Sequence, residues 1–516
     1  MSAEKILIDT NIIIGLEDNK EIDAAFSALQ KKCQENDVQI YIHEASRHDL
    51  ERDKDDPRKR VILSKLDKFL ELRGIPMPAQ SALNPLYGKI IKPNDFVDVT
   101  LLYALHDVGA VDFLVTQDRG IHKRARQLGV DNRVFTVDAA LVWLRDKYEK
   151  ISVPLPFIEE KQCQQVNRHD DIFTSLQADY SGFNQWFDGC IRKHRACWTI
   201  NFNSAIAGIA IRKDETYADL VKEIPSAKIA FLRPPQKITK VCTFKIHEKF
   251  RGEKFGEQLL KQILWWACRN TYDLVYLTVY PKHKELVDLL QQYGFENIAR
   301  SNGEMYLAKS FSPGVLASQP PTEALEYHRK FYPNFKSDPS VGKLLVPIKP
   351  GYYKTLFPEN MNLKQVGLFD SLGGLSGSKI PGNTIRKVYI CHAQINSINP
   401  GDILLFFQLK DENSKDSQCL VTVGIVDGFD ITDRSEDLLR LTAKRSVFSK
   451  AALEGFTEGN SRKVKVINFL LAGHIKPPLP YIFLEKIGIT GPYQSIRRVD
   501  DAHYKLLEQE LHFNEY

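Results

Sequence analysis

A basic, glycine-containing turn lies near the middle of the chain, between an apolar run and a helical pattern. Val241–Ile246 is β-branched and aromatic, which predicts a strand, and the apolar residues after Gly256 recur at helical spacing. We expect this helix to begin near Gly252. The first N–H groups of a helix have no intrahelical partners, and the helix dipole favours negative charge there. Because Arg251 and Lys254 add cations and Gly256 admits a close ligand, these residues predict an anion site.

The elements around this turn are predicted from their periodicity and turn residues. In chain order they are a helix over Ile172–Trp186, a hairpin of Cys197–Phe202 and Ala205–Ile211, the strand and turn described above, a strand over Leu274–Val279 and a helix over Glu285–Tyr293 that ends at Gly294.

This order resembles the acetyl-CoA-dependent GNAT acetyltransferases over residues 165–310. The family's turn reads Arg/Gln-x-x-Gly-x-Gly/Ala. Arg251 and Gly256 match it, whereas Lys254 stands at the first glycine. The resemblance implies a mixed sheet with helices, with acetyl-CoA as cofactor. The cofactor contacts that it implies are Phe244, Ile246, Arg251, Gly252, Lys254, Phe255 and Gly256.

The resemblance supports acetyl-CoA binding more than acetyl transfer. The family often places a tyrosine four residues before the glycine of its Gly-Phe ending, where it acts as the general acid for the leaving thiolate. In this chain, Leu290 stands at that position. His247, Glu248 and His283 are candidates for a base, and each also suits an ordinary surface position. A charged strand-to-helix turn without a ligand is the alternative reading of the turn by itself.

Acidic residues stand at the ends of predicted elements in the first 150 residues. Asp9 directly follows a predicted strand over Lys5–Ile8, and Asp118 stands shortly after a predicted strand over Phe113–Val115. Functional groups in open α/β sheets gather at the carboxyl ends of strands. Asp49 lies in a predicted helix and Asp98 opens one, where acids also serve as caps and dipole partners.

This pattern resembles the PIN-domain nucleases over residues 1–150. That family has strand-Asp-Thr/Ser-Asn, an acid-Leu pair, an acid before Leu-Leu-x-Ala and a late Ser/Thr-x-Asp. The catalytic and metal-binding residues that it implies are Asp9, Asp49, Asp98 and Asp118. Asn11 and Thr116 are helpers, Glu44 is an alternative to Asp49, and Asp95 is a spare acid. Clustered carboxylates suit Mg²⁺ or Mn²⁺, which activates water for attack on a phosphodiester.

Short β-rich runs separated by Gly, Pro and Asn turns follow residue 340 and predict a small barrel. Ile348-Lys349-Pro350 and Pro400-Gly401-Asp402 resemble the ASCH/PUA-like fold, whose members bind RNA or nucleotides. Cations mixed with aromatic residues suit single-stranded nucleic acid, and the same residues also suit a barrel core and a solvated surface. The residues expected to bind RNA are Lys349, Tyr352, Tyr353, Lys354 and Arg386.

Length and composition bound the organisation of the chain. Its 516 residues suggest roughly three domains. We expect a multidomain α/β and α+β protein: a PIN-like α/β sheet over 1–150, a GNAT-like mixed sheet over 165–310, a linker over 311–340 and an ASCH/PUA-like β-barrel over 341–516. The eight cysteines include no CxxC pair, and neither a signal-peptide pattern nor a membrane-length apolar run is present. These features predict a cytoplasmic protein with reduced thiols.

The two enzyme-like segments and the basic C-terminal segment lead to one functional hypothesis. We expect an RNA-directed enzyme that combines a metal-dependent ribonuclease with an acetyl-CoA-binding N-acetyltransferase, with tRNA as a candidate substrate and a toxin-like role as a family expectation. One alternative is an acetyltransferase whose PIN-like and ASCH/PUA-like parts only bind nucleic acid. A non-enzymatic RNA-binding scaffold is the other.

Overall fold

The computed structural model describes most of the chain. The described residues are 4–15, 20–51, 56–75, 83, 86–88, 90–148, 156–202, 205–224, 231–360, 379–381, 384–411, 417–443, 445, 448, 450–458, 463–491 and 493–513. No helix in these ranges is long and apolar enough to cross a lipid bilayer.

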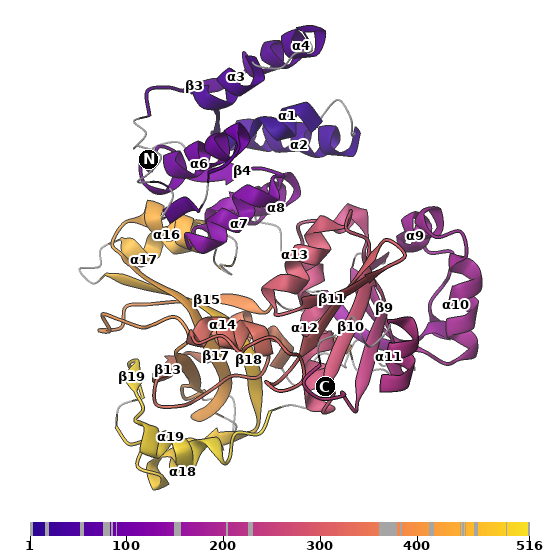
Figure 1. Cartoon of the computed structure of the whole chain (residues 1–516). Coiled ribbons are helices and arrows are strands. Elements are labelled where there is room, and N and C mark those ends of the chain that lie inside the picture. Colours follow the sequence, from indigo (N-terminus) through magenta and orange to yellow (C-terminus); the bar gives the residue numbers. More distant parts are fainter. Residues whose placement is uncertain are drawn as a thin grey trace. The chain divides into compact units, whose positions relative to one another are not determined.

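The chain forms two compact units, and neither is continuous in sequence (Figure 1). The first unit combines residues 1–152 with 432–466, and the second combines 153–431 with 467–516. The segment 432–466 was assigned with the C-terminal barrel from the sequence, and the structure groups it with the N-terminal residues instead. Its placement depends on long-range docking, which leaves no local pattern in the sequence.

A five-stranded parallel sheet forms the centre of the first unit, with strand order β3-β2-β1-β4-β5. The strands are β1 (Lys5–Ile8), β2 (Gln39–His43), β3 (Leu70–Leu72), β4 (Phe113–Val115) and β5 (Val134–Phe135). The described helices are α1 (Thr10–Gly15), α2 (Lys20–Glu35), α3 (Glu44–Glu51), α4 (Asp56–Leu66), α6 (Pro93–His106), α7 (Arg119–Gln127), α8 (Val137–Tyr148), α16 (Ser435–Thr442) and α17 (Lys450–Thr457). The apolar runs that predicted β1 and β4 are fully buried at most positions, which confirms the expected α/β sheet.

The inserted helices α16 and α17 dock at the amino ends of the parallel strands. Arg440 Nε donates to Asp112 Oδ1 at 2.6 Å, and Asp112 directly precedes β4. Lys450 Nζ pairs with Glu4 Oε1 at 3.1 Å, directly before β1. Ala443 is buried in the same apolar cluster as the strands. The opposite, carboxyl edge of the sheet carries Asp9, so the docking surface and the acidic edge lie at opposite ends of the strands.

We expect Arg440→Ala to loosen this docking. The substitution leaves the largely buried Asp112 carboxylate with one fewer charged partner, which costs roughly 1–3 kcal/mol. Hydrogen-exchange mass spectrometry should show faster exchange in peptides covering residues 131–148 and 435–443, by about tenfold or more. Arg434→Ala is the matched control, because Arg434 is exposed and pairs with acids of its own helix. Unchanged protection in Arg440→Ala would contradict the docking.

Two sheets form the second unit. The eight-stranded sheet has the order β11-β12-β10-β9-β8-β7-β6-β14, and the six-stranded sheet has the order β15-β18-β17-β16-β13-β19. Strands of the first sheet are β6 (Phe157–Gln162), β7 (Ala196–Phe202), β8 (Ala205–Glu215), β9 (Ile238–Ile246), β10 (Leu274–Val279), β11 (Glu296–Ser301), β12 (Glu304–Ser310) and β14 (Lys379–Pro381). Those of the second are β13 (Lys343–Ile348), β15 (Arg386–Cys391), β16 (Ile403–Gln408), β17 (Cys419–Thr432), β18 (Val464–Pro480) and β19 (Arg497–Arg498). The closed barrel expected for the C-terminal segment is not confirmed, since the described strands order as a sheet with two edges.

Helices cover the two sheets. They are α9 (Thr174–Asp179), α10 (Phe183–Arg192), α11 (Tyr217–Glu223), α12 (Phe255–Arg269), α13 (Lys284–Gln292), α14 (Ala324–Phe331), α15 (Pro350–Leu356), α18 (Tyr481–Lys486) and α19 (Asp501–Glu508). The single helix expected over Ile172–Trp186 is divided into α9 and α10, because the chain turns between them and the Phe183 N–H bonds Tyr180 O. The expected hairpin of β7 and β8 is confirmed as an antiparallel pair.

The segment expected to link two domains packs into their shared core. It contains α14, and Tyr332 just beyond α14 is 1% exposed. The Tyr332 hydroxyl accepts from Trp265 Nε1 at 2.7 Å and donates to Leu471 O at 2.6 Å. One apolar cluster accordingly runs from α12 to the second sheet. The two sheets of the second unit are therefore parts of one folded body.

Candidate functional sites

The acidic site of the first unit lies where the strand order of its sheet reverses. The chain passes from β1 to β2 on one side, and β4 lies on the other side of β1. Ligands of open α/β sheets bind outside the carboxyl ends of the strands at such a switch point. Asp9 directly follows β1, and Thr116 and Asp118 follow β4. The strand ends therefore bring these three residues together.

Thr116 holds the two strand ends in register. Its hydroxyl is buried and donates to Asp9 Oδ2 at 2.7 Å. The Thr116 hydroxyl oxygen also accepts from Asn11 Nδ2 at 3.2 Å and from the Asp118 N–H at 2.9 Å. Asp9 is 6% exposed. The two residues expected as helpers, Asn11 and Thr116, thus bond each other, and Thr116 contacts the Asp9 carboxylate and the Asp118 backbone.

Gly120 lets a third carboxylate approach the pair. A Cβ added at Gly120 would lie 2.9 Å from Asp118 Oδ1 and 3.5 Å from Asp98 Oδ2, so both carboxylates crowd the same Cα. Asp118 also caps α7, because its Oδ1 accepts from the Ile121 N–H at 3.0 Å. Asp98 reaches the site from α6. No sequence pattern singles out Gly120, because its role depends on a helix that is distant in the chain.

Burial and mutual repulsion perturb two of these acids. Burial raises the pKa of Asp9 to about 6, with a further increase from the charge of Asp118, against hydrogen bonds that lower it. Burial, Asp118 and Asp9 together raise the pKa of Asp98 to about 7. Carboxylates held together against their repulsion favour a bound cation or proton. Asp95, by contrast, accepts from the N–H groups of Ile91 and Lys92 and pairs with Arg124, and these contacts lower its pKa.

The structure describes part of the expected four-acid set. Asp49 lies in α3, and its side chain is outside the described residues. The alternative acid Glu44 accepts from the Gly74 N–H at 2.9 Å. Within the described residues, no three His, Cys, Asp or Glu side chains are arranged as a complete metal-binding group. The described acids therefore supply hard oxygen donors and excess negative charge, and a cation there would need additional ligands such as water.

We expect Asp98→Asn to stabilise the metal-free protein at high pH. A carboxyl whose pKa rises from 3.8 to about 7 on folding opposes folding when ionised. This penalty is absent below pH 3.8 and complete above about pH 7, so wild type loses stability as pH rises between these values. The substitution should recover roughly 2 kcal/mol at pH 8, after a discount for partial exposure. Hydrogen exchange of α6 and α7 in EDTA, at pH 5 and 8, measures this difference.

Asp95→Asn is the matched control for this experiment. Asp95 belongs to the same helix, but its pKa is lowered by two backbone N–H groups and Arg124. Its ionised form therefore stabilises the fold, and its replacement should destabilise α6 at pH 8. Destabilisation by both substitutions would show that Asp98 is an ordinary favourable surface acid.

The second site opens where two neighbouring strands of the second unit part. β9 and β10 are paired through four register positions that end at Val241 and Leu277. Beyond this point β9 stays paired with β8 as far as Ile246, and β10 stays paired with β12 as far as Val279. The facing edges of β9 and β10 therefore separate toward their carboxyl ends. Phe244 and Ile246, both predicted to contact the cofactor, lie on the separated part of β9 and are half-buried.

The basic turn follows directly from this opening. Gly252 and Lys254 adopt left-handed conformations with φ of 84° and 60°, so α12 begins at Phe255 rather than near Gly252. A Cβ added at Gly256 would lie 3.3 Å from Leu289 Cδ2 on α13. Arg251 is exposed and 4.0 Å from a carboxylate oxygen of Glu248. The turn thus places the first N–H groups of a 15-residue helix and two exposed cations beside the strand opening.

Phe255 contributes its backbone to this turn rather than its side chain. Its ring is 3% exposed and lies 5.2 Å from that of Phe202 in the core. Leu290 is also buried, at the position where the family resemblance leads us to expect a tyrosine. Tyr293 is buried nearby, and its hydroxyl donates to Glu257 Oε1 in the first turn of α12 at 3.2 Å.

The residues expected to bind RNA separate into an exposed group and a buried group. Lys349, Tyr352 and Lys354 are exposed on α15 or at its start. Tyr353 is 5% exposed and its hydroxyl bonds Thr422 Oγ1 at 3.0 Å, so it cannot stack on a base. Arg386 is 9% exposed, and its guanidinium lies near Asp427. The structure therefore removes Tyr353 and Arg386 from the expected RNA-binding surface.

Comparisons with known proteins give partial likenesses. No protein-family model matches the chain, and no curated protein sequence does either. An ASCH structure from Zymomonas mobilis is 12% identical, with a TM-score of 0.24, over 34% of this chain and 98% of its own. An IAA acetyltransferase from Bacillus cereus is 13% identical, with a TM-score of 0.22, over 31% and 99%. A GNAT family acetyltransferase from Elizabethkingia anophelis with acetyl-CoA bound is 16% identical, with a TM-score of 0.21, over 30% and 97%.

Proposed function

We propose that the second unit binds acetyl-CoA and transfers its acetyl group to an amine. The observation that carries this proposal is the separation of β9 and β10 beside the amino end of α12. The unpaired strand edges offer backbone donors and acceptors to an extended amide-containing chain, as in sheet augmentation. The helix amino end and Arg251 offer charge to a pyrophosphate.

The proposed cofactor residues divide by the atoms that they offer. Arg251 and Lys254 offer cationic side chains. Gly252, Phe255 and Gly256 offer backbone N–H groups, and Phe244 and Ile246 flank the strand opening.

Titration of the full chain with acetyl-CoA by calorimetry tests the proposal, and saturable binding of one equivalent is expected. An absence of heat at ligand concentrations up to the millimolar range would overturn it.

We also propose that the first unit is a metal-dependent ribonuclease. The convergence of Asp9, Asp98 and Asp118 supports it, because burial and neighbouring carboxylates raise the pKa values of Asp9 and Asp98. These acids and Asp49 would hold Mg²⁺ or Mn²⁺, which supplies an activated water and offsets charge on the phosphate. Thr116 bonds the Asp9 carboxylate and the Asp118 backbone N–H, and Gly120 leaves room for the carboxylates of Asp118 and Asp98.

The proposed substrate is RNA, with tRNA as one candidate. Lys349, Tyr352 and Lys354 form an exposed group of two cations and a ring on α15. Tyr352 is 50% exposed, which suits stacking on a base, and the lysines suit phosphate.

Cleavage of single-stranded RNA by the full chain in Mn²⁺, compared with EDTA, tests the nuclease proposal. Equal rates in the two conditions would overturn it.

A further inference from the structure

The acetyl acceptor would reach the strand opening from the face opposite α12, and α9 spans that face. Lys245, near the carboxyl end of β9, donates through Nζ to Ser175 Oγ of α9 at 2.6 Å. Just beyond the other end of the helix, the Tyr180 ring stacks on the Tyr280 ring with 5.5 Å between centroids, and Tyr180 lies close enough to Glu304 to affect its pKa. Thr278 of β10 also lowers the pKa of Glu304. Thr278 is the first β10 residue beyond the last pair with β9, and it pairs with Tyr306 of β12, so Glu304 lies level with the opening on the strand that flanks β10.

A tight hairpin fixes the position of Glu304. Ser301 and Glu304 face each other across β11 and β12, and Asn302 and Gly303 between them have φ of 50° and 80°. Asn-Gly with two positive φ angles is typical of a two-residue type I′ turn, which leaves little freedom in register. A Cβ added at Gly303 would lie 3.8 Å from the ring of Tyr280. The carboxylate is therefore held on a short, rigid hairpin.

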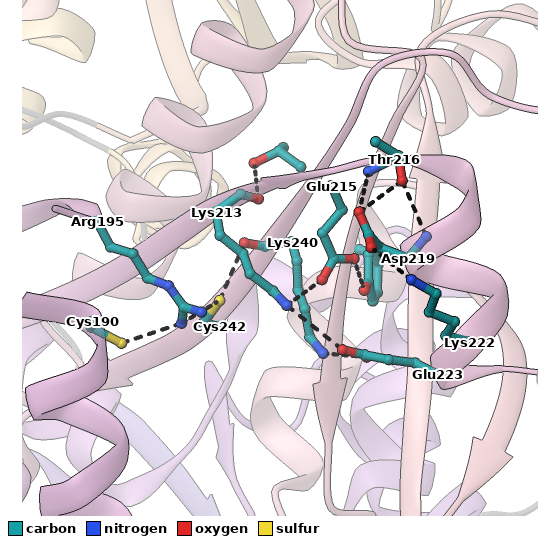
Figure 2. Close-up of polar contacts among 12 residues, drawn as sticks. Cys190, Arg195, Lys213, Glu215, Thr216, Asp219, Lys222, Glu223, Lys240 and Cys242 are labelled. Carbon is teal, nitrogen blue, oxygen red and sulfur yellow. Dashed lines mark hydrogen bonds and ion pairs between the residues drawn. The ribbon is translucent and has the colours of Figure 1, made fainter. Parts of the chain in front are cut away.

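Other carboxylates on this face are neutralised by lysines. Lys213 pairs with both Glu215 and Glu223, and Lys240 pairs with Glu223, as Figure 2 shows. Among the described residues, Glu304 has no ion-pair partner. Burial raises its pKa, against smaller decreases from Lys240 and the hydroxyls of Thr278 and Tyr180. Glu304 is thus a half-buried carboxylate that can take up a proton.

A hollow of about 160 Å³ between α9 and the end of β9 offers room for an acceptor chain. Its lining includes Ser175 and Lys245, which tie α9 to β9, and the carboxylates of Asp171 and Glu248. Lys245 is 3.4 Å from Glu248, so part of this negative charge is already offset. The remaining acids favour an acceptor that carries positive charge. A primary ammonium group at the end of a flexible chain fits this charge and volume.

We propose that Glu304 is the general base of the acetyl transfer and accepts a proton from a primary ammonium acceptor. This inference rests on the proposed acetyl-CoA-dependent function. The ammonium nitrogen gives one proton to Glu304, and the free amine then attacks the thioester carbonyl. A C–N bond forms and the C–S bond breaks. The nitrogen's second proton goes to the departing thiolate of coenzyme A, the third remains in the amide, and Glu304 returns its proton to solvent. His247, Glu248 and His283 then need no role as base.

The experiment measures release of the coenzyme A thiol by the full chain. The probe amines are spermidine, Nα-acetyl-lysinamide and a short peptide with a free amino terminus. Glu304→Gln should lower kcat by about 100-fold or more, as expected for loss of a general base, while the acetyl-CoA Kd stays within twofold. Glu304→Asp should recover part of the rate. Glu285→Gln, an exposed acid at the start of α13, is the matched control and should leave kcat unchanged.

The pH profile separates a base from a structural carboxylate. In wild type, kcat/KM should rise with pH through the pKa of Glu304, and Glu304→Gln should lose this acidic limb. The charged or titratable groups that face Glu304 are Lys240, Glu223, Tyr180 and Tyr306. Tyr180→Phe removes a hydroxyl that lowers the pKa of Glu304, so the limb should move to higher pH. Lys240 and Glu223 stay unchanged in each variant.

Each outcome decides the assignment. Retention of at least half the wild-type kcat in Glu304→Gln would overturn the role of Glu304 and leave acetyl transfer standing. Failure of wild type to acetylate any of the three amines, while acetyl-CoA binds normally, would overturn the assignment of a primary ammonium acceptor. Failure of wild type to bind acetyl-CoA would overturn the proposed function and this inference together.

Discussion

Gly256→Glu should weaken acetyl-CoA binding by on the order of 100-fold, which corresponds to about 3 kcal/mol. Gly256 is the second residue of α12, where unpaired N–H groups and the helix dipole favour a phosphate. The substitution brings a competing carboxylate to this position, and it adds bulk where the ligand must approach the backbone. Calorimetry on the full chain measures the difference between wild type and the variant.

The fold should survive this substitution. A negative side chain in the first turn of a helix is favourable, and the added Cβ would meet the flexible end of Leu289 at 3.3 Å. Gly256→Ala adds the same Cβ without charge and should cost less than about fivefold in affinity. Gly455→Glu makes the same change at an exposed glycine of α17 with open space around it, and should have no effect. Equal affinities for wild type and Gly256→Glu would mean that this turn holds no pyrophosphate.

Local sequence patterns predict elements well where one physical cause dominates. Short apolar runs predicted β1, β4 and β10 with the bounds that the structure shows. The start of α12 was predicted three residues too early, because helical spacing does not show that Lys254 adopts a left-handed conformation. The docking of α16 and α17 onto the first unit could not be predicted, since it joins residues more than 300 positions apart.

Side-chain roles, like the elements, could be predicted where a local pattern determines them and not where they depend on distant parts of the chain. Asp9 and Asp118 could be chosen because the ends of parallel strands meet at one edge of a sheet. Tyr353 was misjudged, although it shares helical spacing with Leu356 and Phe357, both of which are buried. That spacing was the available signal for a core position. An Asn-Gly pair precedes Glu304 and is typical of a tight hairpin, but only the fold shows that this hairpin lies level with the strand opening.

The polar contacts of the acidic site also explain why two of its members are perturbed. Thr116 holds the Asp9 carboxylate through its hydroxyl, and the Ile121 N–H holds the Asp118 carboxylate, so both carboxylates are kept in place against repulsion from Asp98. A site of this kind stores unfavourable electrostatic energy until a cation or proton enters. This arrangement explains the predicted gain in stability on Asp98→Asn. It also leads to a prediction for the substitution of Asp9.

Asp9→Asn should abolish Mn²⁺-dependent cleavage of single-stranded RNA while the fold persists. The new amide oxygen can still accept from Thr116, so the contact between the strand ends remains. Loss of a residue that orients a metal ligand costs about 10–100-fold, so loss of the ligand itself should cost at least about 100-fold in rate. Asp146→Asn, at an exposed acid of α8, is the control and should cleave at the wild-type rate.

The pH dependence of metal binding provides an independent test of the same site. Asp9 and Asp98 must lose protons from groups with pKa values of about 6 and 7 before they bind a cation. Mn²⁺ affinity of wild type should therefore rise between pH 5 and 8, with proton release on binding. Asp9→Asn should both weaken binding and flatten the lower part of this rise. Cleavage by Asp9→Asn that matches wild type, or Mn²⁺ affinity that ignores pH, would exclude the acidic cluster as the metal site.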